Sequence, residues 1–188
     1  MTIGDEFSEV LAAAQAGDAR AVERIYRDTA GLVIGYLRAN GAPEPEDAAS
    51  EVFVSMLSSI GRFAGTEPQF RSWLLTIAHR RLMDGFRRTA RRREDPVPTD
   101  ELGERMIDLT GTDTEAMARL RSLGIIDAID ALTPDQRAVL LLRALADLPV
   151  RDIAEIVGKP ESAVKALLRR AVASLARTLD ERGQAGTA

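Results

Sequence analysis

The stretch FRSWLLTIAHRRLMDGFRRTARRR, residues 70–93, combines a helical apolar pattern with a high density of positive charge. The apolar residues that recur at the spacing of one helix face are Leu74, Leu75, Ala78, Leu82 and Phe86. We therefore predict a helix that packs this face inward. Residues 71–93 carry eight arginines against one acid, a net charge of +7, whereas the whole chain carries −4. Such a basic helix in an acidic protein is typical of a surface that binds a polyanion.

The composition limits the class of protein. The chain has 188 residues, of which 45% are hydrophobic and 29% charged, as expected for folded globular domains. Only 4% are aromatic, so the core must rely on leucine, isoleucine, valine and alanine, which favours helices. There is no cysteine, which excludes disulfides and thiolate metal sites and suits a cytoplasmic location. The acidic start MTIGDEFSEV predicts no signal peptide, and no segment predicts a membrane span.

The segments before residue 70 also have helical periodicity. Helices are expected around residues 7–14, 22–26, 32–37 and 52–60, with Asp18 as an N-terminal cap for the second. Turns are expected at Gly17 and Gly41, and loops at APEPED, residues 42–47, and GRFAGTEPQ, residues 61–69. We predict that these helices and the basic helix form one domain, residues 1–93.

The charge changes sign after residue 93. Residues 94–118 carry eight acids and one base, for −7, with two prolines and little apolar periodicity. This pattern predicts a flexible acidic linker over residues 94–115. The alternative is that the acidic run only neutralises the neighbouring basic helix.

A second helical domain is predicted over residues 116–182. Residues 120–132 favour a helix, and Thr133–Gln136 is a capping box with proline at the first helical position, opening a helix to about Leu145. LPVRDIAEIVG, residues 148–158, predicts a short helix that ends at Gly158, and a long helix follows Pro160. This spacing is typical of a helix–turn–helix. Residues 183–188 are expected to be disordered.

The last long helix has two faces. Its core stripe is predicted to be Val164, Leu167, Leu168, Ala171 and Leu175. Ser162, Lys165 and Arg169 share another face, and residues 159–177 carry five bases and one acid, for +4. A basic face near the start of such a helix can enter the major groove, where Arg or Lys reads guanine. The alternative is an ordinary solvated polar face.

Four stretches in this order resemble bacterial sigma factors of the extracytoplasmic-function (ECF) type within the sigma-70 family. Residues 12–37 resemble the opening region of the family. EDAASEVFVSML, residues 46–57, resembles its polymerase-binding helix, and residues 62–88, with Phe-Arg-x-Trp-Leu at 70–74, resemble its −10 region. Residues 128–171 resemble its −35 domain.

The resemblance implies an all-α specificity subunit of RNA polymerase that needs no cofactor or metal. The implied partners are core RNA polymerase, through its β and β′ subunits, promoter DNA, and an anti-sigma factor. The implied core-polymerase-binding residues are Asp47, Ser50, Glu51 and Phe53. The implied −10 DNA-binding residues are Arg62, Phe63, Arg71, Trp73, His79, Arg80, Arg87 and Arg91. The implied −35 DNA-binding residues are Arg151, Ser162, Lys165, Arg169 and Arg170.

The chain departs from the family pattern at a few positions. Ser50 stands where glutamine is common, and Ala166 and Leu167 replace polar residues of the recognition helix, which implies an atypical −35 sequence. Trp73 fits either a core position or a platform for an unstacked base. His79 is expected to make a polar contact at the surface.

Three other classes of protein remain to be compared with this prediction. The first is a helix–turn–helix regulator that does not bind polymerase, and the second is a helical adaptor without a nucleic-acid role. An enzyme is not expected, because the sequence has no Gly-rich phosphate loop, no nucleophile motif and no triad.

Overall fold

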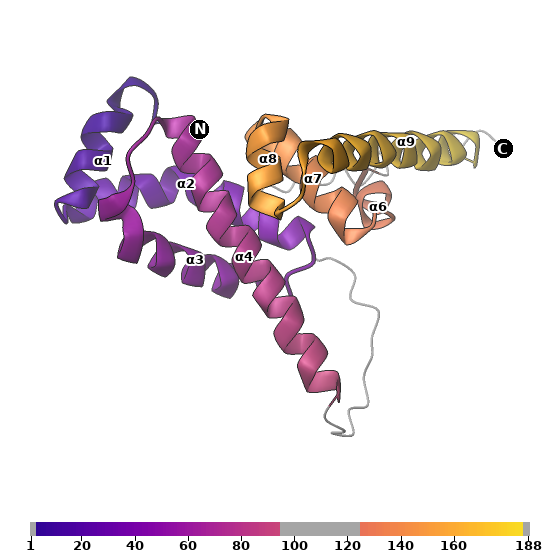
Figure 1. Cartoon of the computed structure of the whole chain (residues 1–188), viewed down its shortest axis with the longest axis horizontal. Helices are drawn as coiled ribbons and strands as arrows, with labels where there is room; N and C mark the ends of the chain where they lie inside the picture. The colour runs from indigo at the N-terminus through magenta and orange to yellow at the C-terminus, as the bar shows by residue number, and fades with distance from the viewer. Residues whose placement is uncertain (1–2, 95–124, 186–188) are drawn as a thin grey trace. The chain divides into compact units, whose positions relative to one another are not determined.

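The computed structural model describes residues 3–94 and 125–185, with side chains at residues 3–88 and 128–180. Every regular element in these ranges is a helix (Figure 1). The chain divides into two compact units, Met1–Met106 and Ile107–Ala188. The predicted all-α fold with two helical domains is thus confirmed. The predicted linker, residues 94–115, lies outside the described residues apart from Glu94, and the domain boundaries stay predictions.

The first unit is a bundle around the long basic helix. A 3₁₀ turn, η1 (Gly4–Glu6), leads into α1 (Phe7–Gln15), followed by α2 (Ala19–Ala39), α3 (Pro45–Ser59), η2 (Ile60–Arg62) and α4 (Glu67–Glu94). The helices α2, α3 and α4 pack against one another, and α1 packs on α2. The largest fully buried side chains of this core include Ile25, Tyr36, Leu37, Met56, Phe70, Leu74 and Leu75. The C-terminal end of α4 extends past α3 (Figure 1).

Helix α2 begins as predicted but is longer than predicted. The Asp18 carboxylate accepts hydrogen bonds from the backbone N–H groups of Arg20 and Ala21, at 2.7 and 3.2 Å. The expectation of two helices, near 22–26 and 32–37, is wrong, because one helix runs through Gly31. A glycine inside a helix costs about 1 kcal/mol. The buried stripe of α2 continues on both sides of Gly31, and burial of these side chains outweighs that cost.

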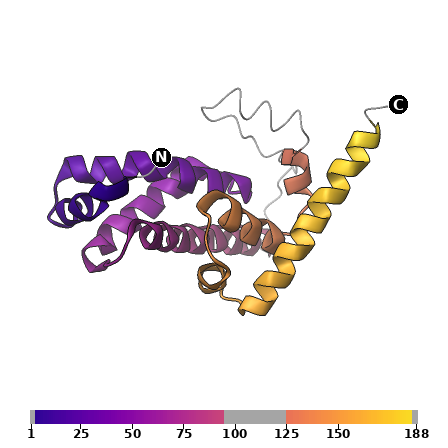
Figure 2. The same ribbon diagram turned by 90° about the horizontal axis from the view of Figure 1, so that it is seen from above.

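The second unit contains the predicted helix–turn–helix. Its elements are α6 (Ile125–Asp130), α7 (Pro134–Ala146), α8 (Val150–Val157) and α9 (Glu161–Ala185). The Thr133 capping box has both of its hydrogen bonds. Gly158 ends α8 with φ at 64°, a left-handed conformation that glycine adopts without strain. The helices α6, α7 and α8 all pack on α9, which runs past the ends of α7 and α8 (Figure 2).

Helix α9 extends further than the sequence predicted. It continues to Ala185, so the expectation of a disordered tail from residue 183 is wrong for its first three residues. The end of the helix, Glu181–Ala185, is rich in good helix formers, which outweigh Gly183. Among the described helices, none is both long enough and apolar enough to cross a membrane.

Candidate nucleic-acid and partner interfaces

The acidic residues predicted to bind polymerase lie on the exposed face of α3. Asp47 and Glu51 are both exposed and one turn apart. Glu51 forms an ion pair with Arg81 of α4, at 3.4 Å, and Arg81 also donates to the Ser55 hydroxyl, at 2.8 Å. Asp47 has no ion-pair partner among the described residues. Its position in the first turn is electrostatically favourable, because the helix N-terminus carries a partial positive charge.

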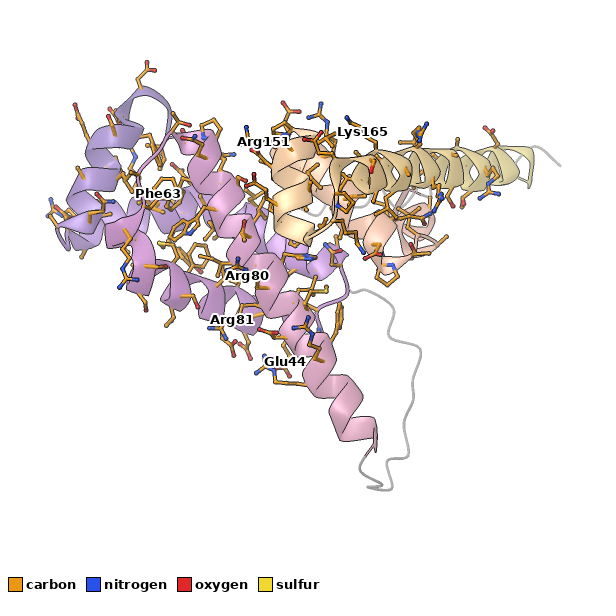
Figure 3. All side chains as sticks on the ribbon, viewed as in Figure 1. Glu44, Phe63, Arg80, Arg81, Arg151 and Lys165 are labelled. Carbon is orange, nitrogen blue, oxygen red and sulfur yellow. The ribbon has the colours of Figure 1, made fainter. Side chains whose placement is uncertain are left out.

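An open groove of about 280 Å³ lies beside this acidic face, between α3 and α4. Glu44 and Arg81, which both line it, are seen on the same side of the unit (Figure 3). Leu82 and Phe86 contribute apolar lining. Phe86 was predicted to face inward, but it is 37% exposed. The groove therefore offers an apolar floor with charged walls, a combination suited to a partner helix.

The other two predicted polymerase contacts differ in exposure. Ser50 is exposed, and its hydroxyl donates to the Glu46 carbonyl at 3.0 Å. Phe53 is buried, with its ring 4.6 Å from that of Tyr26, centroid to centroid. Phe53 thus supports α3 from within, and direct binding of a partner by these two residues stays a prediction.

The loop before α4 carries an aromatic cluster. The Phe63 ring lies 5.2 Å from Phe70 and 5.1 Å from Trp73, measured between centroids. Phe70 is buried, whereas Phe63 and Trp73 are partly exposed. Trp73 packs in the cluster and is partly exposed, and its role as a platform for an unstacked base stays a prediction. Arg62 is exposed next to the cluster.

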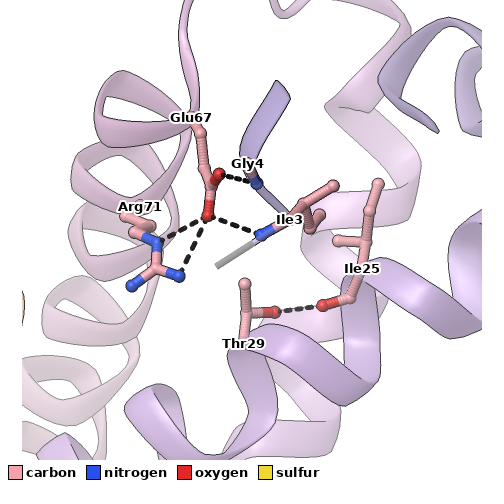
Figure 4. Close-up of polar contacts among 6 residues, drawn as sticks. All are labelled: Ile3, Gly4, Ile25, Thr29, Glu67 and Arg71. Carbon is pink, nitrogen blue, oxygen red and sulfur yellow. Dashed lines mark hydrogen bonds and ion pairs between the residues drawn. The ribbon is translucent and has the colours of Figure 1, made fainter. Parts of the chain in front are cut away.

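Arg71 belongs to a network that ties the chain start to α4. It binds the Glu67 carboxylate at 3.0 Å, and that carboxylate also accepts from the backbone N–H groups of Ile3, at 3.1 Å, and Gly4, at 2.8 Å (Figure 4). Arg71 and Glu67 side chains are only 19% and 12% exposed. The contact with Glu67 gives Arg71 a structural role in this unit, whereas a contact between Arg71 and DNA stays a prediction.

His79 lies in the core. It is 8% exposed, and its Nδ1 is 2.8 Å from the Tyr36 hydroxyl. Burial raises the pKa of Tyr36 above its usual value. The expectation of a surface contact for His79 is wrong, because His79 falls on the helix face of Leu75 and Leu82. Tyr36 supplies the hydrogen-bond partner that a buried imidazole requires.

The remaining predicted arginines of α4 are available at its surface. Arg80 and Arg87 are exposed, and Arg87 forms an ion pair with Asp84 at 3.1 Å. Arg80, which is labelled in Figure 3, has no ion-pair partner among the described residues. The side chain of Arg91 lies outside the described residues. Arg81 and Arg88 line the groove but were not among the predicted site residues. Their spacing of seven residues places them on one face of α4, and this spacing was the signal in the sequence that could have identified them.

The predicted −35 residues are all exposed in the helix–turn–helix. Ser162, Lys165, Leu168 and Arg169 line an open hollow of about 490 Å³. Arg151 and Lys165 are seen on the same side of this unit (Figure 3). Their ion pairs, Arg151 with Glu155 at 3.6 Å and Lys165 with Glu161 at 3.4 Å, are exposed and therefore weak.

The other basic residues of this unit have different surroundings. Arg169 and Arg170 have no ion-pair partner in the part of the chain that the structure describes. Lys159, at the turn, binds Asp135 of α7 at 3.0 Å. Lys159 is therefore paired within the unit, and the exposed basic residues are Arg151 on α8 and Lys165, Arg169 and Arg170 on α9.

Two exposed basic surfaces on separate helical units, one of them a helix–turn–helix, indicate a protein that contacts nucleic acid at two sites. Residues 21–92 match the sigma-70 region 2 family, and residues 122–175 match the sigma-70 region 4 family. The ECF RNA polymerase sigma factor BldN of Streptomyces coelicolor is 34% identical over 92% of this chain and 66% of its own length. The ECF RNA polymerase sigma factor SigL of Mycobacterium tuberculosis is 31% identical over 92% of this chain and 97% of its own length.

The chain belongs to the ECF sigma factors of the sigma-70 family. It is thus a polymerase-binding sigma factor and not a helix–turn–helix regulator that works without polymerase. The family is generally non-catalytic. A similar fold occurs in the sigma factor RpoE in complex with the anti-sigma factor NepR from Bartonella quintana, with a TM-score of 0.62, 17% identity, and coverage of 84% of this chain and 98% of that one.

Proposed function

We propose that this sigma factor uses the α4 surface at the −10 element and the α9 surface at the −35 element of one promoter. The observation that carries the proposal is the presence of exposed, basic surfaces on two separate units of a chain whose net charge is −4. The negative net charge disfavours DNA binding by the free protein. Core polymerase joins the two weak contacts into one avid contact.

Docking on core polymerase is assigned to the acidic face of α3 and the adjoining groove. Asp47 and Glu51 provide negative charge, and the groove provides an apolar floor beside them. A complementary surface on the β′ or β subunit is therefore positively charged and carries an apolar ridge.

Promoter opening is assigned to the loop before α4. Phe63 and Trp73 are partly exposed and their rings contact each other, so they can support a base that has left the duplex. Aromatic stacking of this kind stabilises a single-stranded base by roughly 1–3 kcal/mol. Arg80 and Arg87 are placed to hold phosphates along α4.

Sequence reading at the −35 element is assigned to α9. Lys165 and Arg169 lie one turn apart and line the open hollow, where both can reach base edges in a major groove. Arg151, Ser162 and Arg170 are exposed nearby and provide supporting contacts to the backbone of the duplex.

An anti-sigma factor is proposed as a further partner. RpoE, which shares this fold, is seen in complex with the anti-sigma factor NepR. A partner that covers the acidic face of α3 would compete with core polymerase. Because polymerase acts in the cytoplasm, we place this protein there as well.

Run-off transcription tests the proposal directly. Core polymerase with this protein is expected to start RNA at a defined set of genomic promoters, and sequencing of the 5′ ends identifies the −10 and −35 elements. The purified protein is expected to co-elute with core polymerase. Binding to intact duplex DNA without any effect on the promoters that core polymerase uses would contradict the proposed roles of the two surfaces.

A further inference from the structure

The loop that carries Phe63 is held by a side chain from a helix that lies 45 to 48 residues earlier in the chain. Gln15, the last residue of α1, donates from Nε2 to the carbonyl oxygens of Ile60, at 2.9 Å, and Phe63, at 2.8 Å. The two carbonyls lie on either side of Gly61 and Arg62, so one amide group spans the turn. Gln15 precedes the residues that match the region 2 family, which begin at residue 21.

The other end of the same loop is fastened to the start of α4. The Gln69 side-chain oxygen accepts hydrogen bonds from the Thr66 backbone N–H, at 2.8 Å, and from the Thr66 hydroxyl, at 3.2 Å. Gly65 packs tightly here, because a Cβ at this position would lie 2.7 Å from the Gln69 oxygen and 3.1 Å from the Phe63 ring. The loop is therefore tied by hydrogen bonds at both ends, and little room is left beside Gly65 for a side chain.

Helix α1 is itself fixed against α4 at its beginning. The Phe7 ring packs against Phe70, with 5.6 Å between centroids, and Phe7 is only 5% exposed. Just before it, Glu67 accepts the backbone hydrogen bonds from Ile3 and Gly4 (Figure 4). The first residues thus connect the start of α4, through α1, to the Phe63 loop.

We infer that this N-terminal segment, residues 3–15, is a brace that holds the Phe63 loop in the shape that accepts an unstacked base, and that Gln15 is its positioning residue. The inference rests on the proposed function of the loop. Gln15 acts only through the Ile60 and Phe63 carbonyls. A loop ordered in advance lowers the entropy cost of capturing a base. Two net hydrogen bonds shift such an equilibrium by roughly tenfold.

The experiment uses the single tryptophan of the chain as a local reporter. Trp73 contacts Phe63, so displacement of the loop changes Trp73 fluorescence in the free protein. Gln15→Leu keeps the approximate size of the side chain and removes both donors. Gln15→Lys restores a donor with similar reach. Glu9→Gln, at an exposed site of the same helix, is the matched control.

We expect Gln15→Leu to shift Trp73 emission to longer wavelength and to increase its quenching by acrylamide about twofold. In the complex with core polymerase, the affinity for a single-stranded oligonucleotide of the −10 element should fall roughly fivefold to tenfold. Binding of core polymerase should not change. Gln15→Lys should recover most of both losses, and Glu9→Gln should behave as the wild type.

Unchanged Trp73 emission in Gln15→Leu would overturn the brace, as would a changed emission with wild-type affinity for the oligonucleotide. If the wild-type complex itself does not bind the oligonucleotide, the proposed function of the loop fails, and Trp73 emission still decides whether Gln15 holds the loop. If Gln15→Leu unfolds, Gln15→Asn replaces it, because asparagine shortens the reach of the side chain by one methylene. Trp73 emission and oligonucleotide affinity are then expected to change in the same directions.

Discussion

The two long helices α4 and α9 both carry clustered positive charge, but they use it differently. Helix α4 packs against α2 and α3, and several of its polar residues serve its own unit. Arg71 binds Glu67, His79 contacts Tyr36, and Arg81 pairs with Glu51 on α3. Helix α9 instead keeps its predicted DNA-binding residues exposed on the side away from its buried stripe.

The comparison of α4 with α9 shows under which conditions clustered charge in a sequence predicts a binding surface. In α9 every predicted DNA-binding residue is exposed, so spacing alone identified these surface residues. Leu168 of the predicted core stripe nevertheless lines the same hollow as Lys165 and Arg169. Helix α4 is contacted by both α2 and α3, so its basic and polar side chains can form ion pairs and hydrogen bonds within the unit. Charge density predicts one DNA-binding helix in each unit, and both assignments stay predictions. In α4, Arg71 and His79 have partners inside their own unit that the charge pattern did not predict.

The largest expected effect concerns the acidic face of α3, because α4 and α9 are proposed to contact a promoter together only when the protein is bound to core polymerase. Asp47→Arg with Glu51→Arg should weaken binding of core polymerase at least thirtyfold, because reversing charges at a complementary interface costs several kcal/mol. Both promoter contacts should then be lost together. Co-elution measures binding, and circular dichroism confirms the helical content. Glu9→Arg, exposed on α1, is the control. Normal binding by the double variant would place the docking surface elsewhere.

The next effect concerns α9. Lys165→Ala or Arg169→Ala should cost roughly 1–3 kcal/mol of promoter binding, mainly on the preferred −35 sequence. We expect the low end, because Ala166 and Leu167 replace polar residues of the family pattern. Arg177→Ala, exposed further along α9, is the control and should leave sequence preference unchanged. Unchanged transcription by the Lys165 and Arg169 double variant would make this unit a tether.

An effect of comparable size tests whether His79 of α4 serves the fold. Tyr36→Phe removes a hydrogen bond from the buried imidazole and should lower the free energy of unfolding by about 1–3 kcal/mol. Tyr26→Phe, at an exposed tyrosine, should change it by less than about 0.5 kcal/mol. Denaturant unfolding measures both. Equal stability of the two variants would show that the Tyr36–His79 contact contributes nothing.

The smallest effect separates two adjacent arginines of α4. Arg80→Ala should weaken all promoters alike and reduce the salt slope of promoter binding by about one, the value for one lost phosphate contact. Arg81→Ala should leave that slope unchanged, because Arg81 pairs with Glu51 and Ser55. Titration of promoter binding with salt distinguishes them. Identical slopes for the two variants would contradict the assignment of Arg80 to phosphate.

The sequence predicted most of the fold because the local signals were strong. The capping residues Asp18 and Thr133 and the glycine turn at Gly158 all act within a few residues, and each was found where it was expected. Gly31 did not end a helix, because the packing of residues distant in sequence outweighed its low propensity.

The candidate site was predictable only where it depends on local spacing. The polar face of α9 follows from three- and four-residue intervals. The partner of His79 lies 43 residues earlier in the chain, and Gln15 reaches carbonyls 45 and 48 residues away. No local pattern contains such pairs, so only the assembled unit shows that His79 is internal and that Gln15 holds the Phe63 loop.

The ion pair at the helix–turn–helix has a practical consequence for labelling. The chain contains only two lysines. Both amines form ion pairs, Lys159 with Asp135 at 3.0 Å and Lys165 with Glu161 at 3.4 Å, but the Lys159 side chain is 35% exposed and the Lys165 side chain is 61% exposed. An amine-reactive reagent therefore modifies Lys165 faster than Lys159. The extent of acylation at Lys165, followed by mass spectrometry, is expected to report how fully the proposed −35 surface is covered in an assembly.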